Sequence, residues 1–520
     1  MMSLAPGQMY LEFGTMDALL LCLAVLVILY IINSLYFTIP PPQGVALIRE
    51  PLGKRSFSFR TRLEYINDCE AIFREAYHKY TKKGNAVIVP GIGFRYEIIL
   101  PACSMRWALT QPERILGVNE AFVEIDQVYY SLGHTKYVGD AWQASLVRDE
   151  MNAVLENIVT AMNNELQAAF DTRFGTDEKN WRRVDLLETV RLIVAQAASR
   201  FTVGLPLCRN EEYIRDALDA VDGFIITAGL TFGAPAILRP VVGRIAGLKA
   251  HFAQKKVKQH FEPTYRARLE TLKHTKDDDR NTEPLDHLQL MLRYAQRERP
   301  HELHDLDVMS GRLTAANLGS MHLTSMQVTN MLLNILGSDA EHSTISILRD
   351  EVTQVMGSDT KWSKSHISKM IKADSVARET LRCHSFGGRA IFRKVMVDNL
   401  ETDTGVKLPK GTIVSFLGQP AQMDEDNYHE PLKFDPFRFS RGQQGEGATS
   451  SAVVKRQAFV TTAPDHLPFG HGKHACPGRF LVDFELKMII AYVLTHYDLE
   501  FPEEYGACTY NLANPFITRN

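Results

Sequence analysis

Cysteine is scarce in this 520-residue chain and never paired in sequence. The seven cysteines are widely scattered, and no two form a C-x-x-C motif. This pattern argues against a zinc ribbon and against dithiol redox chemistry. An odd number of dispersed thiols is typical of a protein that works in a reducing compartment.

The sequence also lacks a basic stripe and internal repeats. It carries 58 basic and 61 acidic residues, a formal net charge of -3, and both signs are spread along the chain. Nucleic acid is therefore excluded as an expected partner, because binding it requires clustered positive charge. The 45% hydrophobic content is enough to bury a large core, in one big domain or in several ordinary ones.

No Lys or Arg precedes the longest apolar segment, Ala18–Phe37, whereas basic residues follow it from Arg49 onward. About twenty apolar residues suffice to cross a bilayer as a helix. Basic residues stay on the cytoplasmic side, so we expect residues 1–39 to be a membrane anchor with a lumenal amino terminus, and residues 40–520 to be a cytosolic globular domain. A secretory signal peptide is the alternative, although no clear small-residue cleavage site follows the segment.

Hydrophobic periodicity predicts a mainly α protein with a small β portion. Apolar residues recur at three- and four-residue spacing in Asp140–Ala169, Val184–Val203 and Glu211–Ala228. Val395–Phe416 is rich in β-branched residues and turn signals and predicts a short sheet. Leu230–Gly247 is apolar but broken by Pro and Gly, which favours a buried connection over a segment that dips into a membrane.

One cysteine stands in a distinctive loop, Pro468–Phe480, which reads P-F-G-H-G-K-H-A-C-P-G-R-F. Gly470 permits a tight backbone approach to a flat, bulky group. Pro477 directly follows Cys476 and precedes an apolar helical pattern, and proline favours the first helical position. We therefore expect Cys476 beside a helix N-cap, where the helix dipole and unpaired N–H groups lower the pKa of a thiol. A buried structural cysteine is the competing interpretation.

This loop resembles the haem-binding loop of the cytochrome P450 family, because Phe469, Gly472, Cys476 and Gly478 stand at the family's spacing. The resemblance implies a P450-like fold with an N-terminal transmembrane helix. It also implies haem b, with Cys476 as the axial iron ligand and Phe469, Gly470 and Gly478 around the cofactor. In this family the thiolate pushes electron density onto iron and favours O–O cleavage.

A second match is the E-x-x-R motif of Glu379 and Arg382, which lie on one face of a predicted helix. On its own this spacing is a common surface ion pair. The family closes a triad with a later arginine, and the segment F-D-P-F-R-F makes Arg438 that residue. The implied role is structural, since buried charges need fixed partners.

Haem propionates need cationic or N–H donors. His474 and Arg393 occupy positions where the family carries such donors, and Trp142 with Arg148 resembles its Trp/Arg propionate pair at looser spacing. Trp142 and Arg148 fit packing and surface roles equally well.

Oxygen activation implies a helix above the distal face of the haem, and Arg312–Leu336 is the candidate. It is predicted to be interrupted at Gly319-Ser320, where Ser320 loosens the helix by bonding a carbonyl four residues back. His322 stands where many fungal members have His, but Leu323 replaces the expected threonine and Thr324 follows one position later. Ser320, His322 and Thr324 are thus the candidate proton-relay residues, while His322 also fits a core histidine.

The resemblance is strongest to fungal microsomal members of secondary metabolism. It implies a monooxygenase of the endoplasmic reticulum membrane that uses O2, with electrons from NADPH through a reductase, to oxidise a lipophilic, terpenoid-like molecule. A haem-thiolate isomerase or dehydratase, independent of a reductase, is the alternative that Leu323 keeps open. A non-enzymatic membrane protein is the third. Lys473, Lys455 and Arg456 either dock the reductase or form solvated surface.

Overall fold

The computed structural model describes residues 39–93, 95–274, 283–359, 361–444 and 458–502, together with the single positions 24, 25, 28 and 32. Apart from those four positions, the predicted anchor helix Ala18–Phe37 lies outside the described residues, as do Lys455 and Arg456. Within the described part of the chain, we find no helix that combines the length and the apolar character needed to span a bilayer.

Helices dominate the molecule, as the periodicity predicts. Those of the described residues are α2 Phe59–Asn67, α3 Cys69–Lys79, α4 Met105–Thr110, α5 Val118–Ile125, α6 Val128–Ser131, α7 Lys136–Gly139, α8 Trp142–Asp149, α9 Leu155–Phe174, α10 Leu186–Thr202, α11 Glu211–Gly233, α12 Arg239–His274, α13 His287–Glu298, α14 Pro300–Leu303, α15 Leu306–His342, α16 Thr344–Met356, α17 Lys364–Ser368, α18 Ile371–Cys383, α19 Gln419–Gln422, α20 Arg438–Gln444 and α22 Arg479–His496. The predicted Val184–Val203 and Glu211–Ala228 helices are α10 and α11. Asp140–Ala169 divides between α8 and α9 around the short 3-10 turn Met151–Val154.

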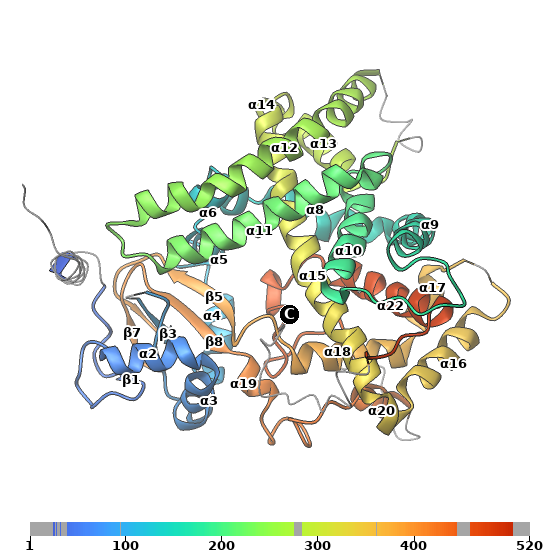
Figure 1. Ribbon diagram of the computed structural model, residues 1–520. Helices are drawn as coiled ribbons and strands as arrows, with labels where there is room; N and C mark the ends of the chain where they lie inside the picture. The colour runs from blue at the N-terminus through green and yellow to red at the C-terminus, as the bar shows by residue number, and fades with distance from the viewer. Residues whose placement is uncertain are drawn as a thin grey trace, which may run out of the picture.

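The strands form a small sheet beside the helices (Figure 1). They are β1 Ala46–Leu47, β2 Val87–Pro90, β3 Tyr96–Ile99, β4 Leu116–Gly117, β5 Arg389–Val395, β6 Leu400–Glu401, β7 Lys407–Leu408 and β8 Ile413–Leu417. The main sheet has the order β1-β2-β3-β8-β5-β4, and β6 pairs with β7. The sheet predicted in Val395–Phe416 is confirmed, and β5 extends it upstream. The β5–β8 register shifts between Ala390 and Arg393, and such bulges re-aim side chains near functional sites.

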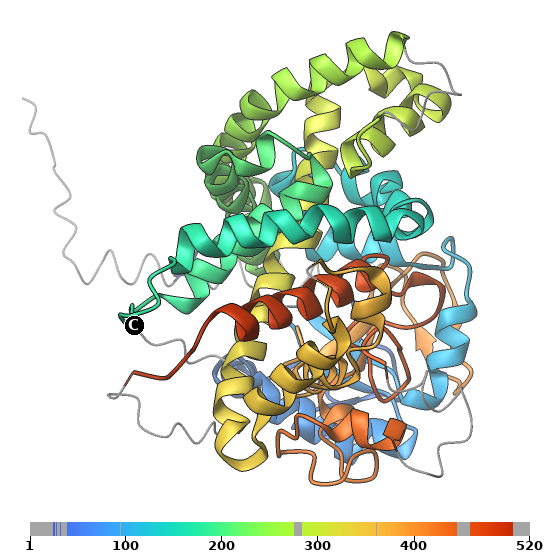
Figure 2. The same cartoon turned by 90° about the vertical axis from the view of Figure 1, so that its right-hand side faces the viewer.

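Helix α15 runs through the middle of the molecule (Figures 1 and 2) and packs against α10, α11, α12, α16 and α18. It is one continuous α-helix of 37 residues, so the interruption predicted at Gly319-Ser320 is wrong. The hydroxyl of Ser320 does donate to the Ala316 carbonyl at 3.2 Å, and that of Ser325 to the Met321 carbonyl at 2.8 Å. These back-bonds form without breaking the helical hydrogen bonds.

Helices α11 and α12 form an antiparallel pair on the surface (Figure 1). Gly223 permits their close approach, because a Cβ there would lie 2.8 Å from the Ala250 Cα atom. The apolar segment Leu230–Gly247 contains the end of α11, a short turn and the start of α12. Val241 and Ile245 are 58% and 65% exposed, so the prediction of a buried connection is wrong.

Candidate active site

Cys476 lies in a tight loop that leads into α22. Gly470 and Gly472 have φ angles of 68° and 73°, values that residues other than glycine rarely adopt. The Cys476 N–H donates to the Phe469 carbonyl at 2.8 Å, which folds the loop back on itself. The Phe469 ring packs on Phe459 at 5.2 Å between centroids. The loop is therefore held by a backbone hydrogen bond and by a contact between aromatic rings.

Helix α22 begins at Arg479 with Gly478 as its N-cap, so Pro477 precedes the helix and is not its first residue. Burial raises the pKa of the Cys476 thiol, while N–H groups of Gly478 and Arg479 and the Arg479 charge lower it. Burial outweighs these groups, so the pKa lowering predicted for this thiol is wrong for the free side chain. The backbone N–H groups of Gly478 and Arg479 would nevertheless stabilise the sulfur as a metal-bound thiolate.

Positive side chains from separate elements meet beside this loop. Arg393 of β5 is buried, has no ion pair within the described residues, and donates to the Phe392 carbonyl at 2.8 Å. Burial lowers its pKa to about 10. Burial also lowers the pKa of His474, and the charges of Arg393 and Arg148 act in the same direction. His474 Nε2 lies 3.8 Å from Glu113 Oε2. Arg148 is itself paired with Asp149, at 2.7 Å between Nε and Oδ1, whereas Arg393 has no such carboxylate partner within the described residues and therefore suits an additional anion.

Trp142, which was also predicted to bind a propionate, donates its hydrogen bond to a different acceptor. The single N–H of Trp142 donates to Glu302 Oε2 at 3.0 Å. Glu302 in turn accepts from Arg312 Nε at 2.7 Å and Nη2 at 2.9 Å, and the Arg312 guanidinium lies 4.5 Å from the Trp142 ring centroid. Trp142 is therefore a packing residue of a buried ion pair in this structure, and its N–H is not free for a cofactor.

One face of α15 is open in the middle of the fold. A Cβ added to Gly319 would meet no atom of the described chain within 4 Å, and Leu323, one turn later, is 40% exposed. Thr324 is buried, and helical geometry turns it by about 100° from Leu323. This placement turns Thr324 away from the Gly319/Leu323 face. Ser320 is half-buried on the flank of that face.

His322 lies on the opposite flank, toward α10 and α11. Burial lowers its pKa, the Asp222 carboxylate raises it and the Arg191 charge lowers it further. Arg191 Nη2 contacts both Asp222 oxygens at 2.7 Å, and both side chains are partly exposed. His322 therefore borders an ion pair that reaches solvent.

The predicted triad is confirmed behind the loop. Arg382 donates to Glu379 through Nε at 2.7 Å and Nη2 at 2.8 Å, and Arg438 Nε contacts the two Glu379 oxygens at 3.0 and 3.1 Å. Arg382 also donates to the Gln422 carbonyl at 2.9 Å and the Pro431 carbonyl at 2.6 Å. The ion pair thus fastens α18 to the segment that follows the sheet.

Comparison with known proteins agrees with this arrangement. Residues 144–513 match the family model for cytochrome P450. The chain belongs to the cytochrome P450 family. It is 48% identical to the cytochrome P450 monooxygenase pbrC of Penicillium brasilianum, over 92% of this chain and 90% of that one. It is 49% identical to the cytochrome P450 monooxygenase astC of Aspergillus terreus, over 91% and 89% of the two chains. It is therefore a P450 monooxygenase that uses haem iron and O2.

The solved structure of retinoic acid-bound cyanobacterial CYP120A1 shares the fold. Its TM-score is 0.57 at 17% identity, over 83% of this chain and 89% of that one.

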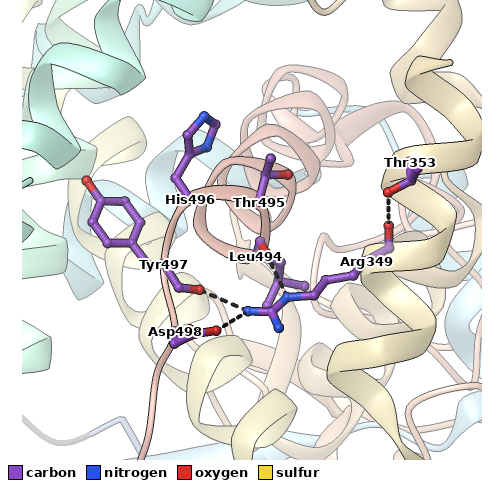
Figure 3. A pocket seen from close by; sticks show the side chains of 7 residues that line it. All are labelled: Arg349, Thr353, Leu494, Thr495, His496, Tyr497 and Asp498. Carbon is purple, nitrogen blue, oxygen red and sulfur yellow. Dashed lines mark hydrogen bonds and ion pairs between the residues drawn. The ribbon is translucent and has the colours of Figure 1, made fainter. Parts of the chain in front are cut away.

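A surface hollow at the end of α22 is separate from the P450 site (Figure 3). Arg349 of α16 donates there to the carbonyls of Leu494 at 2.9 Å and Tyr497 at 3.1 Å and to Asp498 at 2.6 Å. These acceptors include carbonyls left unpaired at a helix end. Arg349 therefore caps α22, and its guanidinium is occupied by that role.

The sequence analysis missed Glu113, Glu302 and the environment of Arg312. Each acts through contacts with residues far away in the chain, such as the 3.8 Å approach of Glu113 to His474. None lies in a motif with fixed spacing, so only the fold brings them together.

Proposed function

We propose that this P450 monooxygenase inserts oxygen from O2 into a lipophilic, terpenoid-like small molecule, with electrons from NADPH delivered by a reductase. The observation that carries the proposal is the tight loop that holds the half-buried Cys476, with two N–H groups directed at the sulfur. The open Gly319/Leu323 face of the central helix α15 adds space for a reacting molecule.

The residues of the site fit a haem. Cys476 would supply the thiolate ligand, and Arg393, His474 and Arg148 would bind the propionates. Gly470 and Gly472 add no side chains to the loop, which would leave room for a flat ring. When bound, the haem supplies the iron at which dioxygen is activated.

The chain's own residues would govern water and protons. Leu323 presents hydrocarbon on the open face, which favours an apolar substrate and excludes water. We assign proton supply to Ser320 and to His322 with its neighbouring Asp222, and not to the buried Thr324. His322 remains mostly neutral at pH 7 because its pKa is lowered, so it can accept a proton and pass it on.

We also propose that the enzyme sits on the cytosolic side of the endoplasmic reticulum membrane, with residues 1–39 as the anchor and residues 40–520 as the catalytic domain. Support comes from the apolar sequence of Ala18–Phe37 and from the exposed Val241 and Ile245 on the α11–α12 pair. Large apolar side chains grouped on one surface segment mark membrane or protein contacts.

The test is the visible spectrum of the reduced, carbon monoxide-bound protein. We expect a thiolate-type Soret band for the unsubstituted chain and its loss in Cys476→Ala. A purified chain without haem, or an unchanged band in the variant, would contradict the assignment of Cys476.

Leu323 favours one second candidate, a haem-thiolate isomerase or dehydratase, because it removes the expected distal hydroxyl. Product analysis with lipophilic candidate compounds separates the two functions. The monooxygenase requires NADPH, reductase and O2, and its product gains one atom of labelled oxygen. The isomerase forms product without any of the three.

A further inference from the structure

Cations from three separate elements lie near the carboxylate of Glu124 on α5. Arg95, in the connection between β2 and β3, donates from Nη1 to Glu124 Oε1 at 2.6 Å. Lys394 of β5 pairs with the other oxygen at 2.7 Å. Arg239, the first residue of α12, donates from Nε to the Ala234 carbonyl at 3.2 Å and forms no ion pair within the described residues. Both oxygens of Glu124 are thus already engaged by the first two cations.

Arg239 belongs to the same group, because the charges of its other members act on it. Burial and the Arg95 charge lower the pKa of Arg239 to about 10, although Glu124 and Tyr130 raise it. Burial also lowers the pKa of Arg95, and Glu124 is the only described carboxylate that opposes this effect. Asp126, which follows α5, forms no ion pair with these cations in the described chain. The group therefore has a surplus of positive charge, which partly buried side chains tolerate poorly without an additional anion.

The Arg95 guanidinium is held in place and has a donor to spare. It lies 4.1 Å from the centroid of the Phe232 ring, near the end of α11. A Cβ at Gly93 would collide with the Gly233 carbonyl, so the connection between β2 and β3 packs directly against that end of α11. The Nε of Arg95 is buried and has no hydrogen-bond partner in the described chain. A buried donor without an acceptor costs free energy, which a bound acceptor would recover.

Exposed apolar side chains border this group. Ile92 is 47% exposed and lies against the end of α11, because a Cβ at Gly233 would be 3.0 Å from its Cγ2 atom. Ile237, in the turn before α12, is 39% exposed. Phe122, on α5 like Glu124, is also 39% exposed and packs edge-on against Phe392 of β5. A positive group bordered by hydrocarbon suits a molecule with one anionic group on a lipophilic body.

We propose that Arg95 and Arg239 form a substrate anchor, which binds a carboxylate on an otherwise lipophilic molecule. This inference rests on the proposed function and narrows its substrate class to acids. Arginine suits the role, because its planar guanidinium matches the two oxygens of a carboxylate. Lys394 directly follows Arg393 on β5, so the anchor lies beside the strand that carries a candidate propionate ligand.

The test uses two probes of nearly identical shape, adamantane-1-carboxylate and the uncharged adamantane-1-carboxamide. Calorimetric titration of the full-length holoprotein at pH 7 measures both affinities. We expect Arg239→Gln to weaken the carboxylate about tenfold or more and to change the carboxamide less than about twofold. Arg244→Gln is the matched control, since Arg244 is an exposed arginine on the same helix that likewise donates to a backbone carbonyl, that of Pro240 at 2.8 Å. It should leave both affinities within about twofold.

Glu124→Gln provides a second readout of opposite sign. Removing this carboxylate releases Arg95 and Lys394 to face the ligand, so the carboxylate should bind about threefold or more tightly and the carboxamide should be unchanged. A purely structural role would instead weaken both probes together. Unchanged or weaker carboxylate binding in Glu124→Gln, equal loss in Arg239→Gln and Arg244→Gln, or no carboxylate binding at millimolar concentration would overturn the anchor.

Anionic lipid headgroups are the rival anion, since α12 also carries the exposed Val241 and Ile245. Dihexanoylphosphatidylglycerol, titrated below its micelle concentration, separates the two. If Arg239→Gln weakens this lipid and leaves adamantane-1-carboxylate unchanged, the arginines bind headgroups and the substrate anchor fails.

Each preparation is first examined for the thiolate-type Soret band. Its absence from the unsubstituted chain would defeat the proposed function. If the band is present and adamantane-1-carboxylate binds Arg239→Gln as well as the unsubstituted protein, only the anchor fails.

Discussion

Leu323 places a hydrocarbon side chain on the open face of α15, and Thr324, one residue later, is buried. The difference arises from one residue of spacing, which rotates a side chain by about 100° on a helix. A hydroxyl is therefore close in sequence to the expected position but on the wrong side of the helix.

We expect Thr324→Val to leave the ratio of product to NADPH consumed within about twofold, because the hydroxyl does not reach the open face. Leu323→Ser, which adds a hydroxyl and opens space on that face, should change the ratio by more than about fivefold. Hydrogen peroxide and product formed per NADPH are the quantities to measure. If Thr324→Val greatly lowers the ratio of product to NADPH consumed while Leu323→Ser leaves it unchanged, Thr324 is the relay residue.

Arg393 allows a test of cofactor retention. Its buried guanidinium has only the Phe392 carbonyl as a hydrogen-bond acceptor and no ion pair in the described chain. A propionate would complete it, and charge-assisted bonds contribute about 1.5–3 kcal/mol. Arg393→Leu should release haem about 10- to 100-fold faster to an excess of apomyoglobin. Arg106→Leu, at an exposed arginine, serves as the control and should match the unsubstituted rate.

At the scale of elements, α22 carries an isolated acid, Glu485. Both Glu485 oxygens are buried without a hydrogen-bond partner in the described chain, and burial raises its pKa to about 8. The unfolded chain ionises this group near 4.5. Between these values unfolding releases a proton, so the stability contributed by the neutral group is complete below about pH 4.5 and declines as the pH rises to about 8.

Glu485→Gln removes this titration. The variant should be as stable as the unsubstituted protein within about 1 kcal/mol at pH 5 and more stable by roughly 2–4 kcal/mol at pH 8. Denaturant unfolding at both pH values measures the difference, with Glu178→Gln at an exposed position as the control. A stability difference that does not grow with pH would contradict the assigned pKa.

The elements that carry strong local patterns were predictable. The Cys476 loop follows from the spacing of Phe469, Gly472 and Gly478, and the triad follows from Glu379 and Arg382 on one helix face. The continuity of α15 was not predictable, because Ser320 back-bonding bends some helices and leaves others intact. Trp142 was misplaced because the sequence does not show that Glu302 competes for its N–H.

At the scale of the whole molecule, the exposed apolar side chains of the α11–α12 pair predict contact with lipid. We expect a polarity-sensitive fluorophore on Ile245→Cys to shift its emission to the blue when the full-length protein is placed in vesicles. The background would carry serine at the exposed Cys69 and Cys103. The same label on Glu178→Cys should not shift, and equal shifts at both positions would contradict a lipid-facing α11–α12 surface.

The Trp142–Glu302–Arg312 contacts join α8 to the first turns of α15. Helix α8 lies next to the Cys476 loop, because Val147 approaches Gly478, and α15 bears the open face at Gly319. A bulky inhibitor that displaces α15 would consequently also displace α8, on the side where the propionates would bind. Tight binding of such an inhibitor above the haem should therefore change how strongly the protein retains the haem at its propionate edge.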